Sequence, residues 1–181
     1  MAIQIEKSFR VKEPLDKVWA LLSDPRRVAT CVPGAKITGQ VNAQTYEGTI
    51  SVKVGPSAMD YNGELEIVRL DQENHELEMV GKGKDVRGRG SASMKMTGKA
   101  RSLEDGGTEV ISTSEVNVVG ILAQMGSRMI NEVSNIIFAQ FIKNFQAYLE
   151  QPGEAASAEA EPISAASLAW AAAKGALHRN S

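Results

Sequence analysis

The sequence predicts an α+β fold in which a curved antiparallel sheet wraps around one long C-terminal helix. Apolar and polar residues alternate in a series of short segments before residue 120, and from about 120 to 149 the apolar period becomes that of a helix. One-sided alternation in consecutive strands is typical of an antiparallel sheet with one solvated face. Only the long helix has enough apolar surface to cover the other face, so the two should pack together.

Two short helices are expected after the first strand. Residues 3–11 alternate strictly, which predicts a half-buried strand. Pro14 then suits the first turn of a helix, and Asp24 can cap a second one. The residues of the strand that share the predicted inner side are Ile3, Ile5, Lys7, Phe9 and Val11.

Alternating segments predict further strands near 46–54, 59–67, 76–79, 92–97 and 109–118. Their polar sides carry most of the charged residues, so their apolar sides should form the concave face. The helix over 120–149 would have about eight turns and a length of roughly 45 Å. Its apolar side is expected to contain Leu122, Met125, Met129, Val133, Ile136 and Phe141.

Composition restricts the class of protein. The net charge is −2, from 20 basic and 22 acidic residues, and no basic run appears, so nucleic acid is not an expected partner. The single cysteine, Cys31, cannot form an internal disulfide, which fits a reducing compartment. Neither a signal-peptide core nor a run of roughly 18 apolar residues is present. A cytoplasmic protein is expected, attached at most peripherally to the inner face of the membrane.

The composition changes at Gln151. Residues 1–150 are predicted to form the folded domain, and residues 151–162, rich in Ala, Glu, Pro and Gly, a flexible linker. Residues 163–181 are predicted to form a short helical tail, because alanine favours helix. Three large apolar side chains of this tail are expected to contact a membrane or a partner protein: Ile163, Trp170 and Leu177.

Methionines point to a chamber for an apolar ligand. Six follow the initiator, and all are predicted on inner sides: Met59, Met79, Met94, Met96, Met125 and Met129. Methionine is flexible and polarizable, so it adapts to ligands of many shapes, although ordinary core packing is the alternative. The full set of residues expected to line the cavity is Met59, Tyr61, Gly63, Leu65, Met79, Met94, Met96, Ser114, Leu122, Met125, Gly126, Met129 and Val133.

Catalysis is not expected, since the inner sides offer almost no acid, base or thiol within reach of a substrate. His75 lies near a turn and His178 in the tail, and no metal-ligand spacing is present, so no catalytic residue and no metal site are predicted. The Tyr61 hydroxyl would either orient a ligand oxygen or bond to its neighbours.

The glycine-rich stretch 81–90 predicts a bent hairpin whose basic residues could meet a phosphate head group or an acidic partner. Trp19 and Cys31 are interpreted as core residues.

The motifs of residues 2–149 resemble a known family. The opening F-R-V-K-E-P-L-D-K-V-W-A-L-L-S-D-P resembles the START-like (SRPBCC) helix-grip superfamily. More narrowly, the chain resembles the carbon monoxide dehydrogenase G-subunit family, in V-P-G-A at 32–35, V-K-V-G-P at 52–56, G-K-G-K-D-V-R-G-R-G-S-A at 81–92 and G-I-L-A-Q-M-G at 120–126.

The resemblance implies a helix-grip fold around an apolar cavity, with no intrinsic cofactor. It implies a non-enzymatic accessory protein of a molybdenum hydroxylase of the carbon monoxide dehydrogenase type. For members with a C-terminal extension it also implies attachment to the membrane and a bound isoprenoid quinone. Two alternatives remain open: a cyclase or dehydratase of the same superfamily, and an assembly factor that binds no ligand.

Overall fold

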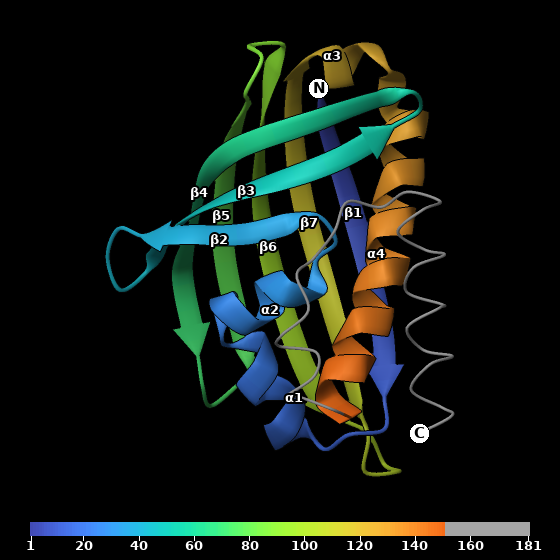
Figure 1. Ribbon diagram of the computed structural model, residues 1–181. Helices are drawn as coiled ribbons and strands as arrows, with labels where there is room; N and C mark the ends of the chain where they lie inside the picture. The colour runs from blue at the N-terminus through green and yellow to red at the C-terminus, as the bar shows by residue number, and fades with distance from the viewer. Residues whose placement is uncertain (151–181) are drawn as a thin grey trace, which may run out of the picture.

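The computed structural model describes residues 1–150, so the predicted linker and tail lie outside the described residues. One antiparallel sheet of seven strands, in the order β1-β7-β6-β5-β4-β3-β2, curves around a long C-terminal helix (Figure 1). The predicted α+β helix-grip architecture is therefore confirmed. The elements are β1 (Ala2–Val11), α1 (Leu15–Leu22), α2 (Pro25–Cys31), β2 (Ala35–Gln40), β3 (Thr45–Val54), β4 (Ser57–Asp71), β5 (Glu76–Asp85), β6 (Gly90–Ser102), β7 (Thr108–Gly120), α3 (Ile121–Gln124) and α4 (Gly126–Glu150).

The edge strand β2 is absent from the sequence prediction. It has only six residues and pairs with β3 through a register shift between Ile37 and Gly39. Its sequence, A-K-I-T-G-Q, contains a single large apolar residue, so the alternation that marks the other strands is too weak to be recognised. Pairing with β3 supplies the strand geometry that the local sequence does not.

The two short helices begin where the sequence predicts. Pro14 is the N-cap of α1, and the helix starts at Leu15. The Asp24 side chain accepts hydrogen bonds from the backbone nitrogens of Arg26 and Arg27, at 3.2 and 3.3 Å. These bonds satisfy amide groups that have no partner inside the first turn of α2, so the predicted cap is confirmed.

The C-terminal helix is not continuous, which corrects the prediction of one helix over 120–149. A short helix, α3, ends at Gln124, and α4 begins at Gly126. Gly126 has a φ of +85°, a left-handed conformation that cannot continue a right-handed helix. The apolar spacing of the sequence runs through this point because α3 and the start of α4 both pack apolar residues against the same sheet.

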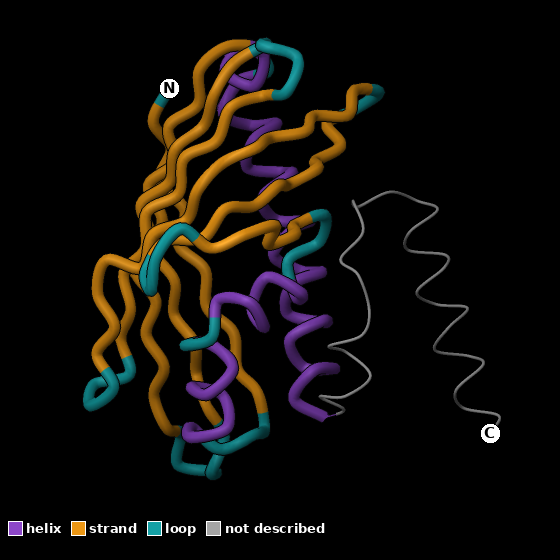
Figure 2. The backbone as a smooth tube through the Cα atoms, turned by 60° about the vertical axis from the view of Figure 1, so that its left-hand side comes forward, coloured by secondary structure: helices purple, strands orange, loops and turns teal. Residues whose placement is uncertain are grey.

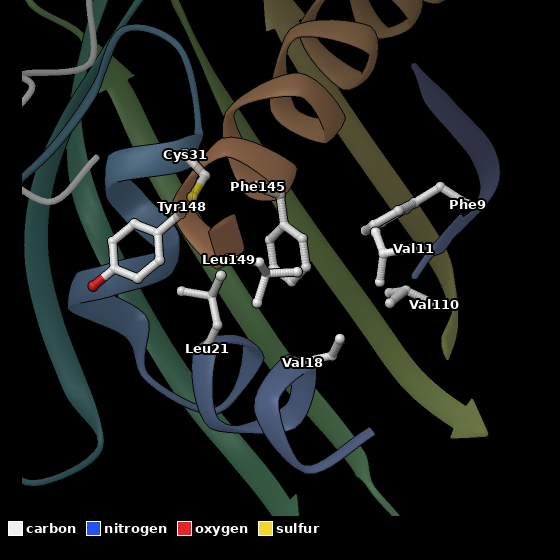
Figure 3. Packing of buried hydrophobic residues seen from close by; sticks show 9 residues of the cluster. All are labelled: Phe9, Val11, Val18, Leu21, Cys31, Val110, Phe145, Tyr148 and Leu149. Atoms are coloured by element: carbon white, nitrogen blue, oxygen red, sulfur yellow. The ribbon is translucent and has the colours of Figure 1, made fainter. Parts of the chain in front are cut away.

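One core cluster closes the lower end of the fold. It joins α1, α2 and the last turns of α4 to β1 and β7, and Figure 3 shows these elements contributing to the same cluster. Phe145 is fully buried and lies edge-on to Phe9, with ring centroids 5.5 Å apart. Figure 2 shows α1 and α2 beside the lower end of the sheet and the C-terminal half of α4. The C-terminal half of α4 is thus held against α1, α2, β1 and β7.

Candidate functional site

Antiparallel pairing brings the predicted inner residues of the sheet into rows across its concave face. Met79 on β5 lies opposite Ile67 on β4 and Met96 on β6, and Met96 lies opposite Ser114 on β7. In the next row, Gly81 lies opposite both Leu65 and Met94. The structure therefore places five of the predicted cavity residues together on this face: Leu65, Met79, Met94, Met96 and Ser114.

The middle of this face is only partly covered. Met79 and Ser114 are buried, whereas Leu65, Met94 and Met96 remain half-buried although they face the helices. Trp19 of α1 packs against this cluster from the lower end, and its Nε1 donates to the Gln72 side-chain oxygen at 2.6 Å. Trp19 is buried, as predicted for a core residue.

Glycines on the concave face differ in the space they leave. A Cβ atom at Gly81 would lie 3.8 Å from Leu65 Cδ1 and 3.9 Å from Met94 Cε, which is ordinary contact. A Cβ atom at Gly63 would lie 1.9 Å from the Lys82 backbone oxygen. Gly63 thus serves the close approach of β4 and β5, which differs from its predicted place beside open space.

A second group of predicted residues lies at the upper end of the face. Met59 and Tyr61 are buried, and Leu122, Met125 and Val133 pack against them. The Tyr61 hydroxyl donates to Met59 Sδ at 3.9 Å, so in this structure it bonds to a neighbour. Burial raises the pKa of Tyr61, and the nearby Asp85 carboxylate adds to the shift.

Two residues of the predicted helix stripe do not face the sheet. Met129 is 37 % exposed and Ile136 is 52 % exposed, which corrects their assignment to the inner side. The buried side of α4 includes Ile130, Phe145 and Tyr148, and at 100° per residue Met129 and Ile136 lie on its flank. Gly126 lies at the helix break, where a Cβ atom would have no other atom within 4 Å.

A small pocket marks the gap between α4 and β3. It has a volume of about 40 Å³ and is lined by Pro33, Ser51, Val52, Lys53, Val133, Ile136 and Ile137. Of the predicted cavity residues, this pocket contains Val133. Ligand pockets are typically about 300–1,000 Å³, so this opening is too small to enclose a quinone ring without movement of the elements around it.

Asp85 is a buried acid on the inner side that sequence reasoning missed. It lies opposite Tyr61 and accepts hydrogen bonds from the Arg89 backbone nitrogen at 2.9 Å and from Arg89 Nε at 2.8 Å. These bonds lower its pKa to about 2. The expectation that the inner sides carry almost no acid is wrong here, because the strand expected near 76–79 extends to Asp85. Its alternation, continued through Gly81 and Gly83, places Asp85 on the inner side.

Two arginines of the basic hairpin at residues 81–90 have a structural role. Arg89 Nη2 and Arg87 Nη1 both donate to the Ala58 backbone oxygen, at 3.1 and 3.2 Å. They therefore fasten the turn between β5 and β6 to the start of β4. Lys82 and Lys84 are exposed on the outer side of β5. A phosphate or an acidic partner would meet chiefly these two lysines.

Cys31 is a structural residue. It is buried, and burial raises the pKa of its thiol to about 11, so it carries no thiolate at neutral pH. Within residues 1–150, no cluster of three or more His, Cys, Asp or Glu side chains has the arrangement of a metal site. No helix in that range is both long and apolar enough to cross a bilayer.

Solved structures share the fold at low sequence identity. A conserved protein from Geobacillus kaustophilus superposes with a TM-score of 0.74 at 19 % identity, covering 82 % of this chain and 96 % of that one. The ZhuI aromatase/cyclase from Streptomyces sp. R1128 gives 0.61 at 15 % identity, covering 87 % and 99 %. A START superfamily protein from Mycobacterium smegmatis gives 0.59 at 10 % identity, covering 82 % and 97 %.

No curated protein matches the sequence. The family comparison is more specific, because residues 8–150 match the G-subunit of carbon monoxide dehydrogenase (CoxG). The matched range contains every strand from β2 to β7, all four helices and the concave face described above. The chain therefore belongs to the carbon monoxide dehydrogenase G-subunit (CoxG) family.

Proposed function

We propose that this protein is a non-enzymatic accessory protein that binds an apolar molecule on the concave face of its sheet. The proposal rests on the partial burial of three side chains. Leu65, Met94 and Met96 face the helices and yet remain half-buried. Leaving apolar surface in contact with water is unfavourable by about 25 cal/mol per Å². A ligand that covers these side chains would regain that free energy.

An isoprenoid quinone is the candidate ligand. Its chain would lie along the methionines, whose flexible side chains adapt to an irregular apolar surface. Its ring would lie near Tyr61, whose hydroxyl would turn from Met59 Sδ to a quinone oxygen. Because the pocket beside Val133 measures about 40 Å³, binding would require the N-terminal half of α4 to move away from β3. The glycine at position 126 is a suitable hinge for this movement.

The buried titratable groups argue against acid–base chemistry. A general acid or base works best with a pKa near the working pH. The pKa of Asp85 is about 2 and that of Cys31 about 11, while the pKa of Tyr61 is raised above its ordinary value. None of these three groups would exchange protons readily at neutral pH, which favours binding over a cyclase or dehydratase activity.

The partner follows from the family. We expect the protein to associate with the subunits of a molybdenum hydroxylase of the carbon monoxide dehydrogenase type, on the cytoplasmic side of the membrane. Residues 163–181 would supply the contact with the membrane through Ile163, Trp170 and Leu177. Interfacial binding grows with buried apolar area and with attraction to anionic lipid. This tail is short and has only Lys174 and Arg179 as permanent positive charges, so the partner enzyme would contribute to attachment.

Extraction of the purified full chain with organic solvent, followed by mass spectrometry, tests the proposal. We expect a quinone or a related apolar molecule to be recovered in a fixed ratio to protein. In Gly81→Leu the added side chain would fill the space between Leu65 and Met94 and reduce this recovery and the binding of an apolar fluorescent probe. Val68→Leu adds volume at a position that is 54 % exposed and is the matched control.

Two results would count against ligand binding. An extract without any apolar molecule, together with unchanged probe binding in Gly81→Leu, would leave the assembly factor without ligand as the better description. Conversion of an added polyketide substrate by the purified chain would instead establish the enzyme alternative.

A further inference from the structure

Charge is distributed unevenly between the two ends of the fold. At the lower end, the β4–β5 and β6–β7 turns have the sequences Q-E-N-H at 72–75 and L-E-D-G-G at 103–107, which contain acids and no lysine or arginine. At the upper end, the β5–β6 turn beside α3 has the sequence V-R-G-R at 86–89 (Figure 1). Strand β6 joins the two ends and spans ~44 Å, several times the Debye length of about 8 Å, so each end presents its own charge.

Two lysines add uncompensated positive charge to the upper end. Lys84 is exposed near the end of β5, and Lys53 is exposed near the end of β3. Across the neighbouring strands, Lys84 lies opposite Asn62 and Ser91, and Lys53 lies opposite Ala58, so no acid faces either lysine. Within residues 1–150 neither lysine takes part in an ion pair. Both charges are therefore available to a partner.

Exposed apolar side chains lie at the same end. Val86, in the β5–β6 turn, is 51 % exposed, and Val119, at the end of β7, is 61 % exposed. Val119 lies opposite Ser91, which in turn lies opposite Lys84, so an apolar and a basic side chain share one row on the outer side of the sheet. Such a combination of exposed apolar residues and cations is typical of a surface that binds a membrane interface.

We propose that the upper end of the domain, formed by Lys53, Lys84, Val86 and Val119, docks on the anionic surface of a bilayer. Interfacial binding combines buried apolar area with attraction to anionic lipid, and this surface offers both. The two valines lie apart, on a turn and at a strand end, so a fluid layer of head groups covers them more readily than a flat protein surface does. Repulsion of the acidic turns would orient the lower end away from the lipid.

The turn that carries Val86 is already ordered. The Val86 backbone nitrogen donates to the Asp60 backbone oxygen at 2.9 Å. Arg89 Nε donates to Asp85 at 2.8 Å, and Arg89 Nη2 donates to the Ala58 backbone oxygen at 3.1 Å. Because these bonds fix the turn before binding, little conformational entropy is lost when the Val86 side chain enters the lipid interface.

This orientation places the pocket between α4 and β3 close to the membrane, because Lys53 belongs to both the docking surface and the lining of the pocket. An apolar molecule would then have a short path between the bilayer and the protein. The inference goes beyond the proposed function, which assigns membrane contact to residues 163–181. It needs only the turns and strand ends of the folded domain, and it is independent of the proposed ligand.

Two labelled variants of the full-length chain test the orientation. Val86→Cys and Val68→Cys introduce a thiol at positions that are 51 % and 54 % exposed, and Val68 lies towards the lower end of β4. The buried Cys31 does not compete for a thiol reagent, because its pKa is raised to about 11. With phosphatidylcholine vesicles that contain phosphatidylglycerol, a nitrobenzoxadiazole label at position 86 should emit at shorter wavelength and be quenched by nitroxide lipids. The label at position 68 should show neither change.

Cosedimentation with the same vesicles tests the contribution of charge. Lys84→Gln should weaken the binding of the full-length chain roughly fivefold, the factor expected for one basic residue near an anionic surface. Lys12→Gln is the matched control, because it removes an exposed lysine between β1 and α1, at the lower end, and should leave binding unchanged.

Several results would overturn the proposal. Vesicle binding without any change in the label at position 86 would leave residues 163–181 as the anchor. Equal changes at positions 86 and 68, or equal binding of Lys84→Gln and Lys12→Gln, would mean that no end of the domain is preferred. A label at position 86 that responds to polyglutamate and not to vesicles would assign the surface to an acidic protein. Each of these results leaves the solvent-extraction test of ligand binding unaffected.

Discussion

At the scale of single residues, Gly63 and Gly81 on the concave face should respond in opposite ways to an added methyl group. A methyl group at Gly63 would lie 1.9 Å from the Lys82 backbone oxygen, whereas at Gly81 it would meet only ordinary contacts beyond 3.4 Å. We therefore expect Gly63→Ala to lower the free energy of unfolding by ~1–3 kcal/mol, the usual effect of overpacking. Gly81→Ala should raise it by ~0.4–1 kcal/mol, because alanine restricts the unfolded chain. Urea unfolding of the two variants checks both signs.

The two substitutions control each other, since both add one methyl group to neighbouring central strands. Equal destabilisation would mean that the strands β4 and β5 do not approach as closely at Gly63 as the structure has it.

Asp85 gives stability a defined dependence on pH. Its pKa falls from an ordinary value of 3.8 to about 2 in the folded protein, chiefly through the hydrogen bond from the Arg89 side chain. A lowered pKa means that the folded state binds fewer protons, so the contribution is complete above about pH 4–5 and disappears as the pH falls towards 2. Asp85→Asn should lower the urea midpoint at pH 7, and its difference from the native chain should shrink between pH 4 and 2.

Asp16→Asn is the control for this series, because Asp16 is exposed in the first turn of α1. A difference between the native chain and Asp85→Asn that stays constant down to pH 2 would show that the carboxylate is not held by Arg89.

At the scale of elements, the break between α3 and α4 depends on the backbone of Gly126. Its φ of +85° is accessible to glycine and strained for other residues, although no atom crowds the position. We expect Gly126→Ala to lower the free energy of unfolding by ~1–2 kcal/mol, the strain of a left-handed residue with a side chain. Gly126→Asn should lower it less, because asparagine enters this conformation more easily. Thermal or urea unfolding of both variants measures the difference.

A finding that Ala and Asn are equally tolerated would indicate that α3 and α4 can join into one helix at little cost. Circular dichroism would then show a small gain in helix content for Gly126→Ala.

Elements are predicted well where apolar periodicity is strong. Strand β1, the cap at Asp24 and the span of α4 follow from local patterns, since alternation and capping act over a few residues. Strand β2 and the break at Gly126 do not follow from them. Both depend on contact with a second element, pairing with β3 in one case and the packing of two helices on one sheet in the other.

At the scale of the whole molecule, the tail should matter for attachment to a membrane. With full-length protein, Trp170→Asp should reduce cosedimentation with anionic vesicles, because an aspartate removes the largest apolar side chain and adds repulsion. Ala172→Asp adds the same charge on the opposite side of a predicted helix and should reduce it less. Equal losses would show that the negative charge, and not the apolar row, determines vesicle binding.

The sequence alone determined the fold class and the family, because periodicity, capping and short motifs are local properties that the chain carries everywhere. It also predicted most of the residues that share the concave face, since alternation decides which side of a strand a residue occupies. Tertiary structure decided the rest. Gly63 is a close contact because β5 passes beside it, and Met129 is exposed because the packing of Phe145 and its neighbours orients α4. Each of these depends on where a second element lies, which no local pattern specifies.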